Sequence, residues 1–392
     1  MFPERFSTLP EYPFPRLRSL LADLEPGGPM VSMSIGEPKH APPAWVSDVI
    51  AEAAEGFRRY PPNEGSQDLR EAIAGWLKRR YDVALDPGSQ ILPLNGTREG
   101  LFNAGLALGV SGSTVLIPNP FYQAYAAAAL AVDARPVYMP APAETGFLPD
   151  FESVSEVDRA AASMIYFCTP SNPQGAVATL DDWARIFAFA EDCDAWLLVD
   201  ECYSEIYRDT PPIGALEAAA KLGVDTDRIL IFHSLSKRSN LPGLRSGFVA
   251  GPADAIARLK QVRAYGGAPL PLPLQAVAAR AWADEEHVEA SRARYQTKYE
   301  LADQILGNIA GYRAPTAGFF LWVPVADDEA ITRDLWTQDG IRVLPGRYLT
   351  REDGGSNRGQ NYIRVALVAD EDDISRGLEA IRAKLTTNGR GK

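Results

Sequence analysis

Short apolar runs alternate with helical, often alanine-rich stretches from residue 90 to residue 250, and no other feature of this 392-residue sequence limits its fold as strongly. Runs of this length and composition are typical of strands that are buried on both faces of a parallel sheet. Helical patterns, such as those at 99–108 and 180–191, separate several of the runs. The alternation predicts an α/β fold, with a mostly parallel sheet covered by helices on both faces. The predicted strands are 91–94, 114–117, 136–139, 164–167, 196–199, 229–232 and 246–250.

The two ends of the chain follow a different pattern. The first 45 residues are rich in proline, with one short helical pattern at 17–24, and such a segment cannot form a core of its own. We predict a large domain at 46–281 and a smaller α+β domain that combines residues 1–45 with residues 282–392. From residue 274 onward the sequence predicts a long helix at 274–306, strands at 319–325, 342–344 and 362–366, and helices at 328–339 and 371–385. The tail at 386–392 is predicted to be disordered.

Composition and charge exclude several classes of protein. A net charge of −12 argues against a nucleic-acid-binding protein, which normally presents a basic face. Three cysteines are too few for a disulfide framework, and the spacing of the cysteines and histidines matches no metal motif. The amino terminus lacks a signal-peptide pattern, and the longest apolar runs are too short to cross a membrane. We therefore expect a cytoplasmic protein that binds no metal, membrane or nucleic acid.

One lysine stands where an open α/β sheet usually binds its ligand, at the carboxyl end of a strand. Lys237 follows the apolar run at 229–232, directly after Ser234 and Ser236, and Arg245 comes eight residues later. A lysine amine whose pKa is lowered can form a Schiff base with a carbonyl, and two hydroxyls with a guanidinium suit a phosphate dianion. Together these groups indicate pyridoxal phosphate, which carries an aldehyde and a phosphate on one small ring. The alternative is a solvated loop with ordinary basic residues.

Two further turns after predicted strands carry groups that could bind the same ligand. Gly96 and Thr97 stand between the strand at 91–94 and a helix, so free backbone N–H groups at the start of that helix could bind an anion. Asn172, in a Ser-Asn-Pro turn after the strand at 164–167, could donate an amide hydrogen bond to a ligand oxygen. In both cases the alternative is structural: a helix capped by Thr97, and an asparagine that bonds its own backbone.

Four more side chains stand in or beside apolar strands. Asp200 ends a run of apolar residues, where an unpaired carboxylate is costly; a protonated pyridine nitrogen could pair with it, and a structural salt bridge is the alternative. Tyr203 could reach the phenolic oxygen of the same ring. Tyr122 could stack on the ring, although core packing explains it nearly as well. Arg364, inside an apolar strand pattern, is best explained by a bidentate carboxylate partner, from the substrate or from the protein.

In this order, these segments resemble the fold-type I pyridoxal-phosphate-dependent aminotransferases, the class that contains aspartate aminotransferase. The matching motifs are the segment around Gly36, NGT at 95–97, NPFY at 119–122, SNPQG at 171–175, DECY at 200–203, SLSK at 234–237 and RV at 364–365. They extend over nearly the whole chain, from about residue 12 to residue 385. Each motif alone is modest, but the combination is highly specific.

The resemblance implies roles for these residues in a homodimer with shared active sites. The catalytic residues would be Lys237, which would bind the cofactor covalently and move a proton, Asp200 at the pyridine nitrogen, and Tyr203. The residues that would bind the cofactor are Gly96, Thr97, Arg98, Tyr122, Asn172, Asp200, Tyr203, Ser234, Ser236, Lys237, Arg245 and, across the dimer interface, Tyr60 of the partner subunit. The residues that would bind the substrate are Gly36, Asn172 and Arg364, with Arg364 holding the α-carboxylate.

A closer resemblance is to the N-succinyl-L,L-diaminopimelate aminotransferases of lysine biosynthesis, through YPFPRLRSLL at 12–21, SIGEPKH at 34–40, LNGTREGLF at 94–102 and FHSLSKRSNLPGLRSGFVAG at 232–251. It implies transfer of an amino group from that substrate to 2-oxoglutarate, which yields glutamate. Other amino-acid aminotransferases and C–S lyases share the fold and stay as alternatives, as does a regulatory domain without catalysis. A second substrate carboxylate would need a cation other than Arg364, and the candidates are Lys39, Arg98 and Arg263.

Overall fold

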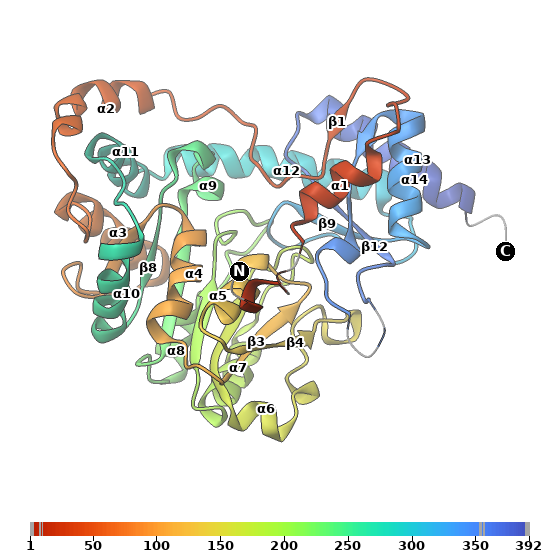
Figure 1. Ribbon diagram of the computed structural model, residues 1–392. Helices are drawn as coiled ribbons and strands as arrows, with labels where there is room; N and C mark the ends of the chain where they lie inside the picture. The colour runs from red at the N-terminus through yellow and green to blue at the C-terminus, as the bar shows by residue number, and fades with distance from the viewer. Residues whose placement is uncertain (1–3, 8, 10, 353–354, 356, 389–392) are drawn as a thin grey trace.

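The computed structural model describes residues 4–7, 9, 11–352, 355 and 357–388, and a seven-stranded sheet forms its centre (Figure 1). In spatial order its strands are β2 (Ile91–Leu94), β8 (Gly247–Ala250), β7 (Ile229–Ser234), β6 (Trp196–Asp200), β5 (Ala162–Cys168), β3 (Thr114–Asn119) and β4 (Arg135–Pro140). β8 runs antiparallel to both of its neighbours, and the pairs from β7 to β4 are parallel. The seven predicted strands and the mostly parallel sheet are thus confirmed.

Successive residues of a central strand pack into opposite helical layers. In β7, Ile229 and Ile231 belong to one core, whereas Leu230 and Phe232 belong to the other. The first core is covered by α2 (Val46–Glu52), α3 (Gln67–Tyr81), α7 (Leu180–Asp192), α8 (Ala215–Leu222) and α11 (Leu272–Ala283), and the second by α4 (Thr97–Leu108), α5 (Gln123–Ala131) and α10 (Ala253–Gly266). A strand that is buried on both faces needs apolar residues along most of its length, and for this reason the apolar runs are nearly continuous. The predicted helices on both faces are confirmed.

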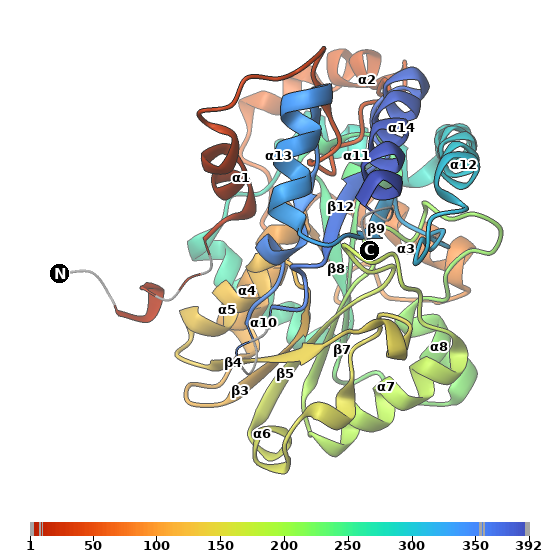
Figure 2. The same cartoon turned by 90° about the vertical axis from the view of Figure 1, so that its right-hand side faces the viewer.

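The C-terminal part of the chain forms a smaller sheet, which lies above the central sheet in Figure 2. Its antiparallel strands are β11 (Leu344–Pro345), β12 (Tyr362–Ala366) and β9 (Phe320–Pro324), and its helices are α12 (Glu286–Leu306), α13 (Asp328–Asp339) and α14 (Glu371–Asn388). The N-terminal segment joins this part, because β1 (Val31–Ser32) pairs in parallel with β10 (Ile341–Arg342). The domain boundaries at 45/46 and 281/282 stay a prediction.

Helix α1 (Pro13–Leu21) shows how the N-terminal segment is held. Leu17 and Leu21 pack into a small core with residues of the C-terminal part. The guanidinium of Arg16 lies 3.9 Å from the ring centre of Tyr348. The proline-rich segment thus obtains from the C-terminal elements the core that it cannot form by itself.

Three predictions about helices need correction. The predicted helix at 274–306 is two helices, α11 and α12, because Asp284 has an extended backbone and its carboxylate accepts the N–H of Glu286 at 3.0 Å, which starts a new helix. The apolar spacing at 45–57 also predicts a single helix, but this segment forms α2 followed by a 3-10 helix, Ala54–Arg58. Helix α14 continues to Asn388, so the predicted disorder is wrong for 386–388, and residues 389–392 lie outside the described residues. A short helix, α6 (Glu156–Ala160), precedes β5.

Two features that would change the functional interpretation are absent from the described residues. Within those ranges, no helix combines the length and the apolar composition that a membrane crossing requires. In the same part of the chain, no three histidine, cysteine, aspartate or glutamate side chains gather in a way that could hold a metal ion. Cys168, Cys193 and Cys202 are free thiols.

Candidate active site

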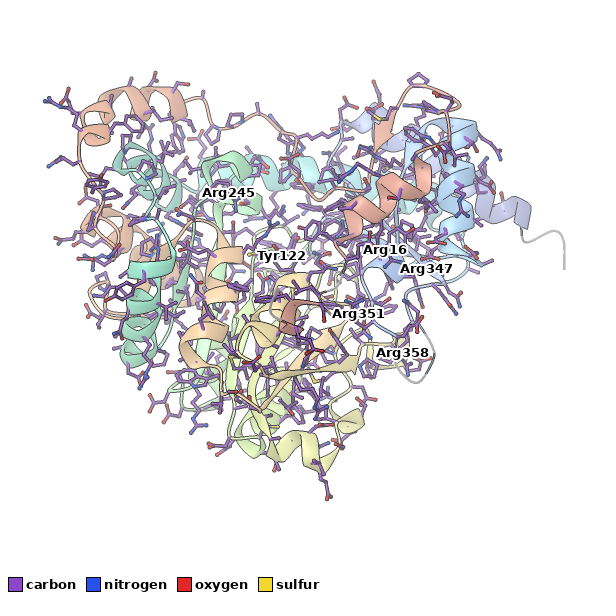
Figure 3. All side chains as sticks on the ribbon, viewed as in Figure 1. Arg16, Tyr122, Arg245, Arg347, Arg351 and Arg358 are labelled. Atoms are coloured by element: carbon purple, nitrogen blue, oxygen red, sulfur yellow. The ribbon has the colours of Figure 1, made fainter. Side chains whose placement is uncertain are left out.

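The carboxyl ends of the central strands open into a cavity of about 320 Å³, which the N-terminal segment and the C-terminal sheet also line. A cavity of this size lies at the lower end of the range for small-molecule sites. Figure 3 labels two of its lining residues, Tyr122 and Arg245, of which Arg245 is exposed to solvent. The predicted site residues that line it are Gly36, Thr97, Arg98, Tyr122, Asn172, Asp200, Tyr203, Ser234, Ser236, Lys237, Arg245 and Arg364. The fold therefore brings together motifs that are far apart in the sequence.

Lys237 enters the cavity from α9 (Leu235–Arg238), a single helical turn at the end of β7. The turn begins at Ser234, whose Oγ accepts the backbone N–H of Ser236 at 3.1 Å. The Lys237 Nζ donates a hydrogen bond to the carbonyl oxygen of Gly36. Burial lowers the pKa of Lys237 to about 8. Since only the neutral amine attacks a carbonyl, this environment increases the fraction of reactive lysine near neutral pH.

Asp200 is the last residue of β6, and its neighbours in register are Cys168 of β5 and Phe232 of β7. Its side chain is buried, and both carboxylate oxygens are engaged: Oδ1 accepts the N–H of Cys202 at 3.3 Å and Oδ2 accepts the hydroxyl of Tyr125 at 2.9 Å. Burial raises the pKa of Asp200. The predicted alternative, a structural salt bridge, does not occur within the described part of the chain. A cationic ligand atom would offset the cost of this buried carboxylate.

The other end of the cavity suits an anion. Helix α4 begins at Thr97, after Gly96 with a φ of 81°. A Cβ atom at Gly96 would lie 2.3 Å from Nη2 of Arg245, so only glycine allows the guanidinium to approach the start of the helix. Arg245 Nη1 is held by the carbonyl oxygen of Pro242 at 2.8 Å. A guanidinium beside the N-terminus of a helix attracts a phosphate, and the hydroxyls of Thr97, Ser234 and Ser236 line the same cavity.

These groups fit pyridoxal phosphate at each of its polar ends. The hydroxyls, Arg245 and the start of α4 suit the phosphate, and the buried carboxylate of Asp200 suits the pyridine nitrogen. Lys237, with its lowered pKa, lies in the same cavity and suits the aldehyde.

Arg364 reaches the cavity from the C-terminal sheet and carries an unused donor. Its Nη1 donates to Oδ1 of Asn172 at 2.9 Å, and its Nη2 donates to the carbonyl oxygen of Ser34 at 2.7 Å. Its Nε is buried and has no hydrogen-bond partner among the described residues. Burial lowers the pKa of Arg364 to about 10. A buried donor without a partner is costly, and a ligand carboxylate would supply the missing acceptor.

Of the three candidates for a distal carboxylate, only Arg98 lines the cavity within the described part of the chain. Its Nε donates to the hydroxyl of Tyr122 at 2.5 Å and its Nη2 to the hydroxyl of Tyr12 at 3.0 Å. Arg263 is instead buried, with its Nε 3.0 Å from the carboxylate of Glu99. Arg263 is thus engaged in a buried ion pair and Lys39 is not a lining residue, so Arg98 is the candidate that this cavity favours.

Two predicted site residues lie elsewhere, and several lining residues were not predicted, among them Tyr12 and Tyr125. Tyr60 is fully exposed, at 101%, and is not a lining residue of this chain's own cavity as described. Gly96 is not a lining residue of the cavity, and it lies directly beside the guanidinium of Arg245. Tyr125 was missed although it follows Tyr122 by three residues, a spacing that places two side chains near each other when a helix begins. Tyr12 carried no signal, because its contact with Arg98 joins segments that are distant in sequence.

Comparison with known proteins gives the same interpretation as the geometry. The family model for aminotransferase class I and II matches residues 28–381. A transaminase of 4-dedimethylamino-4-oxo-anhydrotetracycline from Streptomyces rimosus is 35% identical over 383 residues, which cover 96% of this chain and 99% of that protein. An LL-diaminopimelate aminotransferase from Dehalococcoides mccartyi is 31% identical over 387 residues, which cover 96% of each protein.

Solved structures agree with this comparison. An aminotransferase from Neisseria meningitidis is 39% identical and superposes with a TM-score of 0.93, over 97% of this chain and 99% of that one. A probable N-succinyldiaminopimelate aminotransferase from Thermus thermophilus is 25% identical and superposes with a TM-score of 0.84, over 95% of this chain and 100% of that one. Sequence, architecture and cavity thus agree over nearly the whole length, and the chain belongs to the class I and II aminotransferases.

Proposed function

We propose that this enzyme transfers the amino group of N-succinyl-L,L-diaminopimelate to 2-oxoglutarate, as a step of lysine biosynthesis. Members of its family depend on pyridoxal phosphate and exchange an amino group between an amino acid and a 2-oxo acid. The diaminopimelate skeleton is supported by the names of a relative and of a similar solved structure. The choice of the succinylated form rests on Arg98. That the enzyme acts in the cytoplasm stays a prediction from the sequence.

Pyridoxal phosphate supplies an aldehyde that joins the substrate amine and a ring that withdraws electrons. Lys237 is proposed to bind this aldehyde and then to move the proton at the substrate α-carbon, which requires its amine to be neutral for part of the time. A pKa of about 8 meets that requirement near neutral pH. The hydrogen bond to the Gly36 carbonyl gives the amine a fixed position in the cavity.

The remaining residues are proposed to bind and orient. Arg364 would hold the α-carboxylate through its free Nε and through donors that now contact Asn172 and Ser34. Asn172 and Tyr203, whose side chains are linked at 3.4 Å, would hold the phenolic oxygen of the cofactor. Thr97, Ser234, Ser236 and Arg245 would bind the phosphate, Tyr122 would stack on the ring, and Asp200 would pair with the pyridine nitrogen.

Arg98 carries the argument for a second, distal carboxylate. The cations that line the cavity in the described part of the chain are Arg98, Lys237, Arg245 and Arg364. The other three already have proposed partners in the cofactor and in the α-carboxylate. The contacts of Arg98 are tyrosine hydroxyls, which are neutral, so its charge is not compensated by an acid. A free cation attracts the carboxylate of a succinyl group and repels the distal ammonium of unmodified diaminopimelate.

Glu37 is the residue that favours the competing substrate, unmodified L,L-diaminopimelate. It also lines the cavity, and a carboxylate could hold the distal ammonium of L,L-diaminopimelate. The two donors must therefore be compared directly.

The decisive experiment is a donor panel with 2-oxoglutarate that contains N-succinyl-L,L-diaminopimelate, L,L-diaminopimelate, aspartate and alanine. We expect the highest kcat/KM for the succinylated donor. Arg98→Ala should lower that kcat/KM by about ten- to a hundredfold, which corresponds to loss of a partly exposed charge contact. The kcat/KM for alanine as amino donor should change much less. Lys39→Ala is the matched control, because Lys39 is not a lining residue. A preference for another donor, or equal losses on both donors, would overturn this assignment of the substrate.

We further propose a homodimer in which Tyr60 of the partner subunit binds the cofactor phosphate. Support comes from the full exposure of Tyr60 and from the exposed side chains of Phe57 and Tyr265, at 59% and 90%. Sedimentation should give twice the mass of one chain. Two inactive variants, Tyr60→Ala and Lys237→Ala, should regain activity when they are mixed, because one site of the mixed dimer then contains both native residues. Without such recovery, Tyr60 acts within its own chain or not at all.

A further inference from the structure

Tyr125 lies on α5 and contacts the carboxylate on which the cofactor ring is proposed to depend. Its side chain is 1% exposed and lines the cavity. Its hydroxyl donates to Oδ2 of Asp200 at 2.9 Å, while the N–H of Cys202 occupies Oδ1 at 3.3 Å. With one donor on each oxygen, the plane of the carboxylate cannot rotate without the loss of a hydrogen bond. These two donors therefore fix the orientation of Asp200.

The packing around Tyr125 makes its hydroxyl a fixed group. Its ring stacks on Tyr166, with a centre-to-centre distance of 4.5 Å and an angle of 12° between the planes. Tyr166 is itself anchored, since its hydroxyl donates to the carbonyl oxygen of Leu101 on α4 at 2.7 Å. The backbone N–H of Tyr125 bonds the carbonyl oxygen of Tyr122 at 3.0 Å. A donor held in this way loses little conformational entropy when it binds, and can orient its acceptor.

The hydroxyl also affects the charge of Asp200. Burial alone favours the neutral carboxylic acid, because the ionised form loses its hydration. A hydrogen bond from a neutral donor stabilises the ionised form without adding a charge that would compete with a cationic ligand. If the hydroxyl were lost, Asp200 would hold a negative charge less well, and a proton shared with a pyridine nitrogen would favour the carboxylate more. The ion pair then weakens in favour of a neutral pair.

We propose that Tyr125 is a positioning residue, which keeps Asp200 ionised and aimed at the pyridine nitrogen of the cofactor. This inference rests on the proposed role of Asp200. Tyr125 needs no contact with the substrate or with the cofactor, because it acts through the carboxylate.

The chain offers a matched pair of substitutions for the test. Tyr125→Phe removes only the hydroxyl and keeps the ring stack. Tyr166→Phe removes the other hydroxyl of the same stacked pair, which donates to Leu101 and not to Asp200. Apoenzyme is prepared from each variant, and the dissociation constant of pyridoxal phosphate is measured by quenching of tryptophan fluorescence. We expect an increase of about ten- to a hundredfold for Tyr125→Phe, as for a lost hydrogen bond to a charged group, and less than about threefold for Tyr166→Phe.

A double-mutant cycle separates action through Asp200 from a general loss of structure. In the background of Asp200→Ala, Tyr125→Phe should not weaken cofactor binding further, because the acceptor of the hydroxyl is gone. The single variant should also lower kcat while KM for the amino donor stays unchanged. Additive losses in the cycle, or equal effects of Tyr125→Phe and Tyr166→Phe, would overturn the role of Tyr125 and leave that of Asp200 intact. If Asp200→Ala itself leaves cofactor binding unchanged, the proposed role of Asp200 fails, and the inference fails with it.

Discussion

Arg364 of the C-terminal sheet and Asn172 of the central sheet share a hydrogen bond of 2.9 Å, from Nη1 of the guanidinium to Oδ1 of the amide. The bond fixes which end of the amide faces Arg364, so Nδ2 of Asn172 points toward the hydroxyl of Tyr203, 3.4 Å away. A single amide therefore connects the proposed binding site of the substrate carboxylate with that of the cofactor ring. The two sheets have separate cores, and the cavity exists only where they meet.

Arg364→Lys tests this arrangement. A lysine keeps the charge but cannot donate to Asn172, Ser34 and a carboxylate in the fixed planar geometry of a guanidinium. We expect KM for amino donors and 2-oxo acids to rise by about a hundredfold, as for the loss of bidentate charge-assisted hydrogen bonds. Steady-state kinetics with both substrates measure this. An amine donor without a carboxylate is the control, and its kinetics should change little; an equal loss for that amine would contradict the assignment.

Lys237→Ala tests the covalent anchor. We expect the purified wild-type enzyme to be yellow, and borohydride to bleach the colour and to leave a reduced adduct on Lys237. The alanine variant should lose turnover by several orders of magnitude, because one side chain is proposed both to bind the cofactor and to move the proton. Mass spectrometry of a tryptic digest locates the adduct. An adduct on any other lysine would contradict the proposed site as a whole.

Asp200→Ala tests the partner of the ring nitrogen. Without the carboxylate, the pyridine nitrogen stays mostly unprotonated and withdraws electrons less strongly. We expect kcat to fall by about a hundredfold or more, by analogy with the loss of one preorganised electrostatic partner. The kinetics must be measured at saturating cofactor, so that weaker binding is not mistaken for slower chemistry. Near wild-type kcat at full occupancy would make Asp200 a structural residue.

The sequence predicts the central sheet well because burial on both faces leaves little freedom. In β7 the four residues from Ile229 to Phe232 are all apolar, and such a run stands out against the helices around it. The break between α11 and α12 could not be predicted from periodicity, since both helices carry the same apolar spacing. The break depends on one local bond, from the Glu286 N–H to the Asp284 carboxylate.

The candidate site was predicted where its residues follow a strand and missed where contacts come from a distance. Asp200 and Lys237 stand next to apolar runs, so their sequence context reveals them. Neighbouring residues in the sequence do not show which part of the fold a side chain will contact. Arg263 carries the same charge as Arg98, yet it is buried against Glu99 and the carbonyl oxygen of Pro93. Tyr12 likewise reaches Arg98 only because α1 packs on the C-terminal part.

Lys298 presents a charge inside the protein that the proposed chemistry does not use. It lies on α12, is 1% exposed, and its Nζ contacts Nε2 of His40 at 2.8 Å. Burial lowers the pKa of Lys298 to about 8, and the acids Asp370 and Glu371 oppose this shift only in part. Burial, followed by the charges of Lys298 and Arg294, lowers the pKa of His40 to about 4. His40 is therefore neutral at physiological pH and accepts the hydrogen bond from Lys298.

These shifts predict how the stability of the protein depends on pH. An unfolded lysine keeps its usual pKa of about 10.4, so between pH 8 and pH 10 the unfolded chain binds more protons at this site than the folded chain does. The contribution of Lys298 to the free energy of unfolding must therefore rise with pH across this window and stay constant below it. Below pH 8 the folded state carries the full cost of a buried ammonium, and Lys298→Met should then stabilise the protein by about 1–2 kcal/mol. The gain should shrink toward pH 10.

Urea unfolding of the enzyme with bound cofactor at pH 7 and pH 10 measures this difference. Lys260→Met, at an exposed lysine of α10, is the control for the change in net charge. If Lys298→Met destabilises the protein equally at both pH values, packing and the bond to His40 outweigh the buried charge.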